Sequence, residues 1–434
     1  MSSENIKQGN PLAEEKIGRL IARFAVPAII SMLVSSLYNI VDQIFIGQGV
    51  GMLGNAATNI AFPVSIICTA TALLLGIGSA SNYNLEAGAG RNERAAEIAG
   101  NGLAMLVICG VSIGAIVLIF LNPLLHLFGV TKEILPYAQD YTGIKVLERI
   151  ERAARIEPFL ILTTGGNHLI RADRSPTYSM TCMLTGAILN TILDPLFIFV
   201  CHWGIKGAAA ATVIGQVVSG LMVIYYFSKK RKMELKRSMF LPKAGYLKMI
   251  VSLGMASCIN QIAMAIVQTT MNNTLRYYGA QSMYGSEIPL ACVGVISKVN
   301  MVFMAIAIGI AQGCQPIWGF NYGAHNYDRV REAYKKAFAI CIVLGVVFFG
   351  CFQLFPRQIV SIFGSGSEAY FHFAERYFRI FMFVTFLNGI QPMSSAFFTS
   401  IGKSKLGIVV SLTRQIIFLL PLILIFPLFM GIDG

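Results

Sequence analysis

Charged residues are scarce in this chain: Asp, Glu, Lys and Arg make up 13% of its 434 residues, whereas apolar residues make up 55%. A soluble domain carries about twice that share of charge, because its surface is hydrated. Apolar stretches of about 20 residues recur along almost the whole sequence, and a helix of that length crosses the hydrocarbon core of a bilayer. The sequence therefore excludes an ordinary soluble fold and predicts an all-α polytopic membrane protein.

Short motifs that carry enzyme chemistry are also missing. The sequence contains no HExxH, no CxxC and no phosphate-binding loop of the G-x-x-x-x-G-K-[ST] type. Its five His residues show no metal-ligand spacing, and its nine Cys residues lie scattered in apolar stretches, where they are typical of small packing residues. A membrane-embedded enzyme and an ATP-driven pump are therefore disfavoured, and we expect no cofactor.

The apolar stretches predict eleven membrane spans. They lie near residues 20–46, 54–80, 95–121, 137–170, 176–200, 207–228, 246–274, 288–314, 333–354, 371–399 and 406–430. The formal charge of +13 is distributed between these spans, with Lys and Arg concentrated in every second gap, so no nucleic-acid surface is expected. Because cytoplasmic loops carry the excess of Lys and Arg, we expect a cytoplasmic N-terminus and a multi-pass protein of the inner membrane.

The chain contains an internal duplication. NLEAGAGRNERA at 84–95 matches FNYGAHNYDRVR at 320–331, and LFG at 127–129 matches IFG at 362–364. The duplication predicts two six-helix bundles, one over 1–228 and one over 246–434, joined by a basic cytoplasmic linker at 229–245. The second half contains five apolar spans, so the twelfth helix is expected to be missing from this sequence.

One segment conflicts with a membrane location. Seven charged residues occupy 145–157, within the fourth expected span. Tyr141 and Ser175 are 34 residues apart, whereas Tyr377 and Ser404 in the second half are 27 apart. The excess of seven residues predicts an insertion in the first half, and a disabled, non-functional variant is one consequence to consider.

Two carboxylates lie deep inside apolar stretches. Asp42 stands in YNIVDQIFIG and Asp194 in ILNTILDPLFIF, each about two-thirds of the way along its span. Acids inside a membrane are costly and are usually functional. Asn190 is one helical turn before Asp194 and is expected to face the same way. A packing role, with both acids neutralised by neighbouring amides or hydroxyls, is the alternative.

These stretches, together with NHLIRADRSP at 167–176 and the repeated Gly-containing loops, resemble the multidrug and toxin extrusion (MATE) family, its DinF-like branch above all. The resemblance covers nearly the whole chain. It implies a V-shaped pair of six-helix bundles that export cationic or amphipathic small molecules in exchange for H+ or Na+. The chain departs from the family at the charged segment, at the absent last span and at Arg174, where a Gly is common.

The resemblance also implies functional residues. The coupling-cation site would comprise Asp42, Asn167, Asn190 and Asp194, because the second half carries Asn260 and Asn388 in place of acids. Candidate drug-binding residues are Tyr38, Met255, Gln261, Met264, Met301 and Met304. Met side chains repack readily around varied ligands, although lipid-facing filler explains the Met residues equally well.

The sequence thus predicts a monomeric secondary exporter of drugs or toxins whose partners are its substrate, its coupling ion and the lipid bilayer. The alternative within the same superfamily is a flippase for lipid-linked oligosaccharides. A group of cations lining the central cavity would favour the flippase. The sequence offers Lys298, expected to be the most interior cation outside the charged segment, and Arg276.

Overall fold

The computed structural model describes residues 10–127, 135–136, 139, 156–282, 287–362 and 368–431. Within these ranges the chain forms helices, turns and connecting coil, without any strand. Among the described residues, nine helices are long and apolar enough to cross a membrane, and the count is ten if the bent pair Tyr370–Phe381 and Thr385–Ser400, which meet at 48°, is taken as one span. The remaining expected span, the fourth, near 137–170, starts outside the described residues. Most of the charged segment, 145–155, lies there too.

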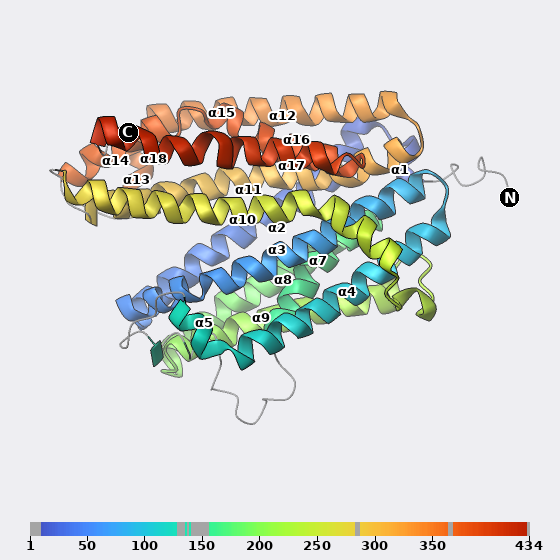
Figure 1. The fold of residues 1–434 in the computed structure, drawn as a ribbon, viewed down its shortest axis with the longest axis horizontal. Helices are drawn as coiled ribbons and strands as arrows, with labels where there is room; N and C mark the ends of the chain where they lie inside the picture. Colours follow the sequence, from blue (N-terminus) through green and yellow to red (C-terminus); the bar gives the residue numbers. More distant parts are fainter. Residues whose placement is uncertain are drawn as a thin grey trace.

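The first half of the chain folds into one helical bundle (Figure 1). Its helices are α2 (Ile17–Gly49), α3 (Met52–Gly88), α4 (Asn92–Ile119), α7 (Ile156–Ala172), α8 (Pro176–Pro195) with η2 (Leu196–Val200), and α9 (Ile205–Tyr225) with η3 (Tyr226–Lys230). The short helices α1 (Pro11–Glu14) and α5 (Leu121–Leu127) flank them. Small residues of α9, such as Ala208 and Ala211, are fully buried and let α8 pack closely.

The second half forms the other bundle. Its helices are α10 (Ala244–Ala280), α11 (Glu287–Gly323), α12 (Tyr327–Leu354), α13 (Pro356–Ser361), α14 (Glu368–Phe381), α15 (Thr385–Asn388), α16 (Ile390–Ser400), α17 (Ser404–Leu412), η5 (Thr413–Leu419) and α18 (Leu420–Met430). Aromatic residues such as Phe352, Phe373 and Phe378 fill its core. The side chains of α18 remain largely exposed, as expected for a helix that faces lipid.

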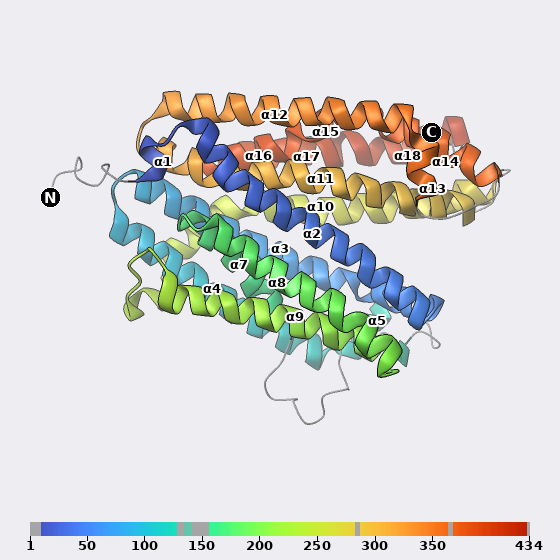
Figure 2. The same cartoon turned by 180° about the vertical axis from the view of Figure 1, so that it is seen from behind.

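The linker runs between Lys230 and Ala244 and is anchored on the first bundle. It contains a short 3-10 helix, η4 (Arg237–Phe240). The side chain of Asn101 on α4 accepts a hydrogen bond from the Lys243 backbone N–H (2.6 Å) and donates one to the Met239 carbonyl (3.0 Å). Figure 2 shows α1 at the same end of the molecule as this linker, and we call that end the linker side.

The helix boundaries confirm that the chain is duplicated. α4 and α12 begin 235 positions apart (327 − 92) and also end 235 apart (354 − 119). The next pair of equivalent turns gives a smaller offset, since α8 and α17 begin 228 positions apart (404 − 176). The first half therefore has seven additional residues between α4 and α8, in agreement with the predicted insertion.

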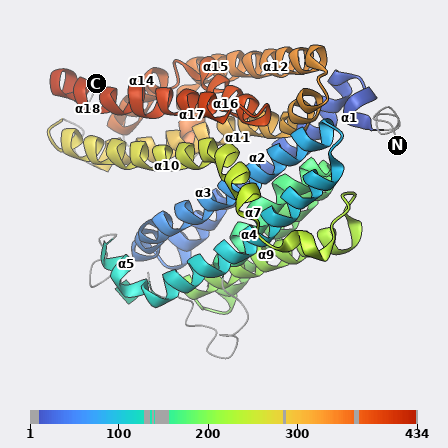
Figure 3. The same cartoon turned by 45° about the vertical axis from the view of Figure 1, so that its right-hand side comes forward.

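The two bundles converge on the linker side and diverge toward the opposite end (Figure 3). α3 packs against α10, and α11 packs against α2. Glycines permit this close approach: a methyl group at Gly78 would overlap the Ile250 carbonyl, and one at Gly313 would overlap the Ala25 backbone. The molecule is thus a V that is closed at the linker side.

Candidate functional site

The two interior acids meet in the first bundle. Asp42 on α2 and Asp194 at the end of α8 lie within hydrogen-bonding reach of each other. Asp194 is fully buried, and the Oδ1 atom of Asp42 is buried without a donor from the described residues. Two carboxylate groups can form such a contact favourably only when a proton or another cation lies between them.

Asn190 connects this acid pair to a third helix. Its side chain donates to Asp194 (3.3 Å), as the one-turn spacing predicted. The Asn190 amide can also be turned by 180°, so that its oxygen faces α9. In that orientation the oxygen accepts hydrogen bonds from Thr212 N–H (3.3 Å) and Oγ1–H (3.2 Å), and the amide nitrogen donates to Asp194 Oδ2. Thr212 did not stand out in the sequence, and the one available signal was a hydroxyl within the Ala-rich start of α9.

Local backbone features place Asp194 at an irregular point of its helix. Pro195 follows it directly and lacks an N–H, so one carbonyl of the preceding turn loses its usual donor. From Leu196 the chain continues as the π-helix η2. π-helical turns often occur at functional sites. On α2, Pro27 has a similar effect, and the Ser31 hydroxyl donates to the Pro27 carbonyl (2.8 Å).

The predicted site residues are not all brought together. Asn167 lies five residues before the end of α7 (172 − 167), whereas Asn190 lies fourteen residues after the start of α8 (190 − 176). These helices are joined by a short turn, so at 1.5 Å per residue about 13 Å separates the two positions along the bundle. Asn167 instead donates to the Thr163 carbonyl (2.8 Å) and accepts no described hydrogen bond at its buried Oδ1.

The predicted drug-binding residues lie on helices at the interface between the bundles. Tyr38 is one turn before Asp42 and is close enough to interact electrostatically with both acids. Met255, Gln261 and Met264 lie on α10, and Met301 and Met304 lie on α11. Met304 packs against the aromatic core of the second bundle, which favours a packing role for that residue.

The interior of the second bundle is polar but contains no acid among its described residues. Gln391 donates to Asn260 (3.3 Å) and to Ser411 (3.3 Å), and it accepts from Arg414 Nη1 (3.3 Å). Arg414 lies ten residues into the last span, in the π-helix η5, and was missed in the sequence.

The expectation that Lys298 is the most interior cation was wrong. Arg171 near the end of α7 is only 2% exposed, whereas Lys298 is half-buried. The sequence could not show this, because Arg171 stands close to a polar turn where an exposed side chain is the ordinary outcome.

Comparison with known families identifies the fold. The MatE family model matches residues 27–196 and 256–425, which is one match in each bundle and more than half of the chain. The chain belongs to the MATE family. The family consists of transporters and not of enzymes. Each half of this MATE chain thus carries one copy of the family's repeat.

Relatives of known name agree with this assignment. The multidrug export protein MepA of Staphylococcus haemolyticus is 23% identical over 425 residues, covering 97% of this chain and 89% of that protein. MepA of Staphylococcus aureus strain NCTC 8325 is 24% identical over 424 residues, covering 96% and 88%.

Solved structures confirm the fold class. A multidrug resistance MATE transporter in an outward-facing conformation is 25% identical, with a TM-score of 0.87 over 100% of this chain and 93% of that one. A superfamily member from Pyrococcus furiosus, described as having a binding pocket of reversed polarity, is 24% identical, with a TM-score of 0.85 over the same shares. The nearly all-helical pair of repeated bundles is therefore confirmed.

Proposed function

We propose that this chain is a secondary active exporter of cationic or amphipathic small molecules, driven by inward movement of H+, with Na+ as the alternative ion. The observation that carries the proposal is the contact between Asp42 and Asp194 inside a membrane bundle. A pair of carboxylates in a low-dielectric interior cannot hold two negative charges at low cost. The pair is therefore a binding site for one small cation.

The coupling ion and the drug would be linked through the shape of the first bundle. When the cation leaves, Asp42 and Asp194 repel each other, and α2 and α8 can adjust at Pro27 and Pro195, where the helical hydrogen bonding is interrupted. A ligand shifts such an equilibrium only if it binds the two conformations with different affinity. Exchange follows when the cation stabilises one arrangement of α2 and the drug stabilises the other.

Four further assignments belong to the proposal. The names of the MepA relatives support a multidrug cargo, for which Tyr38, Met255, Gln261, Met264, Met301 and Met304 are the proposed contacts. The basic linker supports a cytoplasmic location for the linker side, and hence for the N-terminus, in the inner membrane. In that orientation the V opens to the outside. We also propose a DinF-like branch and a monomer.

A second candidate function is favoured by one observation. Arg414 in the second bundle contacts neutral side chains among the described residues, and no described acid forms an ion pair with it. A cation inside the second bundle could bind a cargo with an acidic head group, such as a lipid-linked oligosaccharide, by electrostatic attraction. The acid pair of the first bundle supports the exporter more directly.

Reconstituted vesicles distinguish these possibilities. Efflux of an ethidium-type dye is measured after a pH gradient alone, a Na+ gradient alone, or neither. We expect efflux with the pH gradient. Dye movement that is equal under all three conditions would refute ion coupling, and flipping of a fluorescent lipid-linked sugar without dye efflux would establish the alternative.

Asp42→Asn tests the role of the acid pair. The amide keeps the size of the side chain but cannot hold the exchanged cation, so gradient-driven efflux should fall by at least about tenfold. Equilibrium dye binding should persist in part. Asp328→Asn, at an exposed acid in the first turn of α12, is the matched control. Unchanged efflux by Asp42→Asn would contradict the proposed role.

A further inference from the structure

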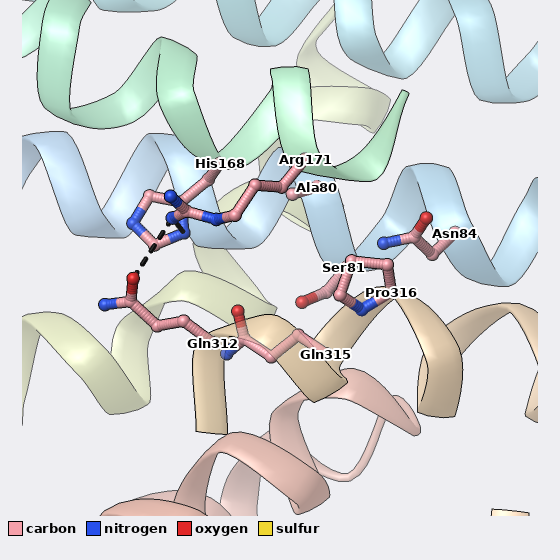
Figure 4. A pocket seen from close by; sticks show the side chains of 8 residues that line it. All are labelled: Ala80, Ser81, Asn84, His168, Arg171, Gln312, Gln315 and Pro316. Carbon is pink, nitrogen blue, oxygen red and sulfur yellow. Dashed lines mark hydrogen bonds between the residues drawn. The ribbon is translucent and has the colours of Figure 1, made fainter. Parts of the chain in front are cut away.

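A small polar pocket between the bundles has no room for a ligand larger than water. Figure 4 shows this pocket between α3, α7 and α11, and its volume is about 10 Å³. The Arg171 guanidinium donates to three neutral acceptors, namely Ser179 Oγ (3.1 Å), His168 Nδ1 (2.9 Å) and Gln312 Oε1 (3.1 Å). Because Gln312 belongs to α11, these bonds join the bundles and leave a search for ligand sites to other parts of the molecule.

A much larger hollow lies on the linker, at the end of the first bundle. Its volume is about 490 Å³, and it is lined by Ser228, Lys229, Arg231, Lys232, Met233, Glu234, Leu235 and Lys236. Four of these residues are cations and one is an acid. Lys230 and Arg237, both exposed, adjoin the lining residues in the sequence. The linker hollow therefore has a strongly positive lining.

Arg231 holds the backbone of the linker hollow in shape. Its guanidinium donates to three backbone carbonyls on both sides of the turn, those of Phe227, Ser228 (3.4 Å) and Leu235 (3.2 Å). Met233 is buried in the core of the first bundle, and the Lys232 backbone N–H donates to Asp173 Oδ2 (2.7 Å). The linker hollow is therefore a fixed part of the fold.

Three lysine ammonium groups of the linker hollow can bind an anion. Lys229 is exposed and pairs with no described acid. Lys236 forms an exposed pair with Glu93 (3.1 Å), and such pairs contribute little to stability. Lys232 Nζ donates to the Arg174 carbonyl (2.7 Å), which uses one of its three N–H groups. An anion can therefore bind here without breaking a buried interaction.

An apolar strip on α9 leads from the membrane to the linker hollow. Leu221, Ile224 and Tyr225 are 53%, 46% and 52% exposed, and their spacing places them on one face of the helix. Ser228, which lines the hollow, follows three positions later (228 − 225). The Lys230 ammonium lies 5.8 Å from the centre of the Tyr225 ring. Because this helix is a candidate membrane span, Ile205–Lys230, lipid chains cover the strip.

We propose that the linker hollow binds the headgroup of one anionic glycerophospholipid, whose acyl chains lie along the apolar strip of α9. The lipid phosphate accepts hydrogen bonds from Lys229, Lys232 and Lys236. A phosphocholine headgroup carries its own cation and is attracted less. The apolar strip favours a lipid over a soluble phosphate or an acidic peptide, neither of which has chains to place there. The bound lipid connects the end of α9 with the segment that leads to α10.

The test uses the full chain purified in detergent and does not depend on transport. Phosphatidylglycerol and phosphatidylcholine with the same acyl chains are added in equal amounts, and native mass spectrometry identifies the first lipid that stays bound. We expect phosphatidylglycerol to be preferred by at least about fivefold. This preference should be lost in the triple variant Lys229→Gln, Lys232→Gln and Lys236→Gln. It should be kept in a control that removes the same charge from exposed side chains of the second bundle, Arg331→Gln, Lys335→Gln and Lys405→Gln.

The single variant Lys229→Gln covers the case in which the triple variant fails to fold, and its preference for phosphatidylglycerol should fall severalfold. Equal binding of the two lipids by the wild type would overturn the proposal. An equal loss of preference in both triple variants would overturn it as well, because net charge alone would then explain the binding. Glycerol phosphate should not displace the lipid at equal concentration; displacement would identify a soluble phosphate compound as the ligand and refute the lipid.

Discussion

The two bundles share their packing but differ in their interior charges. α3 and α11 are equivalent with an offset of 235, so Gly78 corresponds to Gly313. Their contacts, Ile250 on α10 and Ala25 on α2, are then equivalent too, which sets an offset of 225 between α2 and α10. With this offset Asp42 corresponds to Val267, and with the offset of 228 Asp194 corresponds to Leu422. The acid pair of the first bundle thus has two apolar counterparts in the second.

The comparison distinguishes residues that maintain the fold, which both bundles share, from residues proposed to bind the ion, which only the first bundle has. Both bundles need the same close contacts to form the V, so the small residues that permit these contacts occur in both. An ionisable side chain inside the membrane raises the free energy of the folded protein in either bundle, and residues of this kind usually have a function. The first bundle is therefore the proposed site of ion binding, whereas the described interior of the second bundle contains no buried acid and includes the cation Arg414.

The most severe test places an acid in the second bundle. Val267→Asp puts a carboxyl at the position equivalent to Asp42, where the side chain is 6% exposed and the counterpart of Asp194 is Leu422. Without a partner acid to share a proton, the substitution should destabilise the chain by about 3 kcal/mol. We expect a large loss of monodisperse protein on size-exclusion chromatography. Val267→Ala is the control, because it removes the packing of Val267 without adding a charge and destabilises the chain by about 1–2 kcal/mol. If both variants lost the same amount of monodisperse protein, the second bundle would tolerate an interior acid as well as the first.

Equivalence of the shared packing can be tested at the paired glycines. Gly78→Ala and Gly313→Ala each place a methyl group against the backbone of the opposite bundle, an overpacking that costs about 1–3 kcal/mol. Both should lower the Tm by similar amounts in thermal unfolding followed by size-exclusion chromatography. Gly245→Ala, where no atom lies within 4 Å of the added methyl, should leave the Tm unchanged or raise it. A loss in only one of the pair would break the proposed symmetry.

Arg414 offers a weaker but more selective test. Arg414→Gln removes the interior cation of the second bundle and keeps a group that can bond to Gln391. We expect a severalfold gain in affinity for a cationic dye and a severalfold loss for an anionic amphiphile, equivalent to about 1 kcal/mol each way. Equilibrium dialysis against both ligands measures the change. Lys405→Gln, at an exposed side chain near the start of α17, should alter neither affinity; equal shifts in both variants would indicate a general effect of net charge.

The sequence predicted the features that depend on composition and spacing. Hydropathy located the spans, the repeat revealed the duplication and its seven additional residues, and the similar positions of Asp42 and Asp194 along their spans are consistent with their proximity in the fold. Features that depend on how helices rotate against one another were not predictable. Thr212 reaches Asn190 from α9, and Arg171 points inward to Gln312, only because of the helix packing. Asn167 was grouped with the acids by family likeness, and its distance along α7 separates it from them.

The smallest expected effect concerns the turn between α7 and α8, where the first bundle again has a charge that the second lacks. Asp173 is fully buried there, and the equivalent position in the second bundle, with the offset of 228, is Ile401. Burial raises the pKa of Asp173, although bonds from Lys232 N–H and the Tyr226 hydroxyl oppose that rise. Because the folded-state pKa lies above the unfolded value of about 3.9, the contribution of this group to stability is present at low pH and is lost as the pH rises through the folded pKa. The Asp173→Asn side chain cannot titrate, and its amide oxygen can still accept both hydrogen bonds.

The fall in the free energy of unfolding above about pH 4 should therefore be smaller in the Asp173→Asn variant than in the wild type. Denaturant unfolding at a series of pH values measures the slope, with Glu234→Gln in the linker as an exposed control. A slope identical to that of the wild type would show that the burial of Asp173 is fully offset by its two donors.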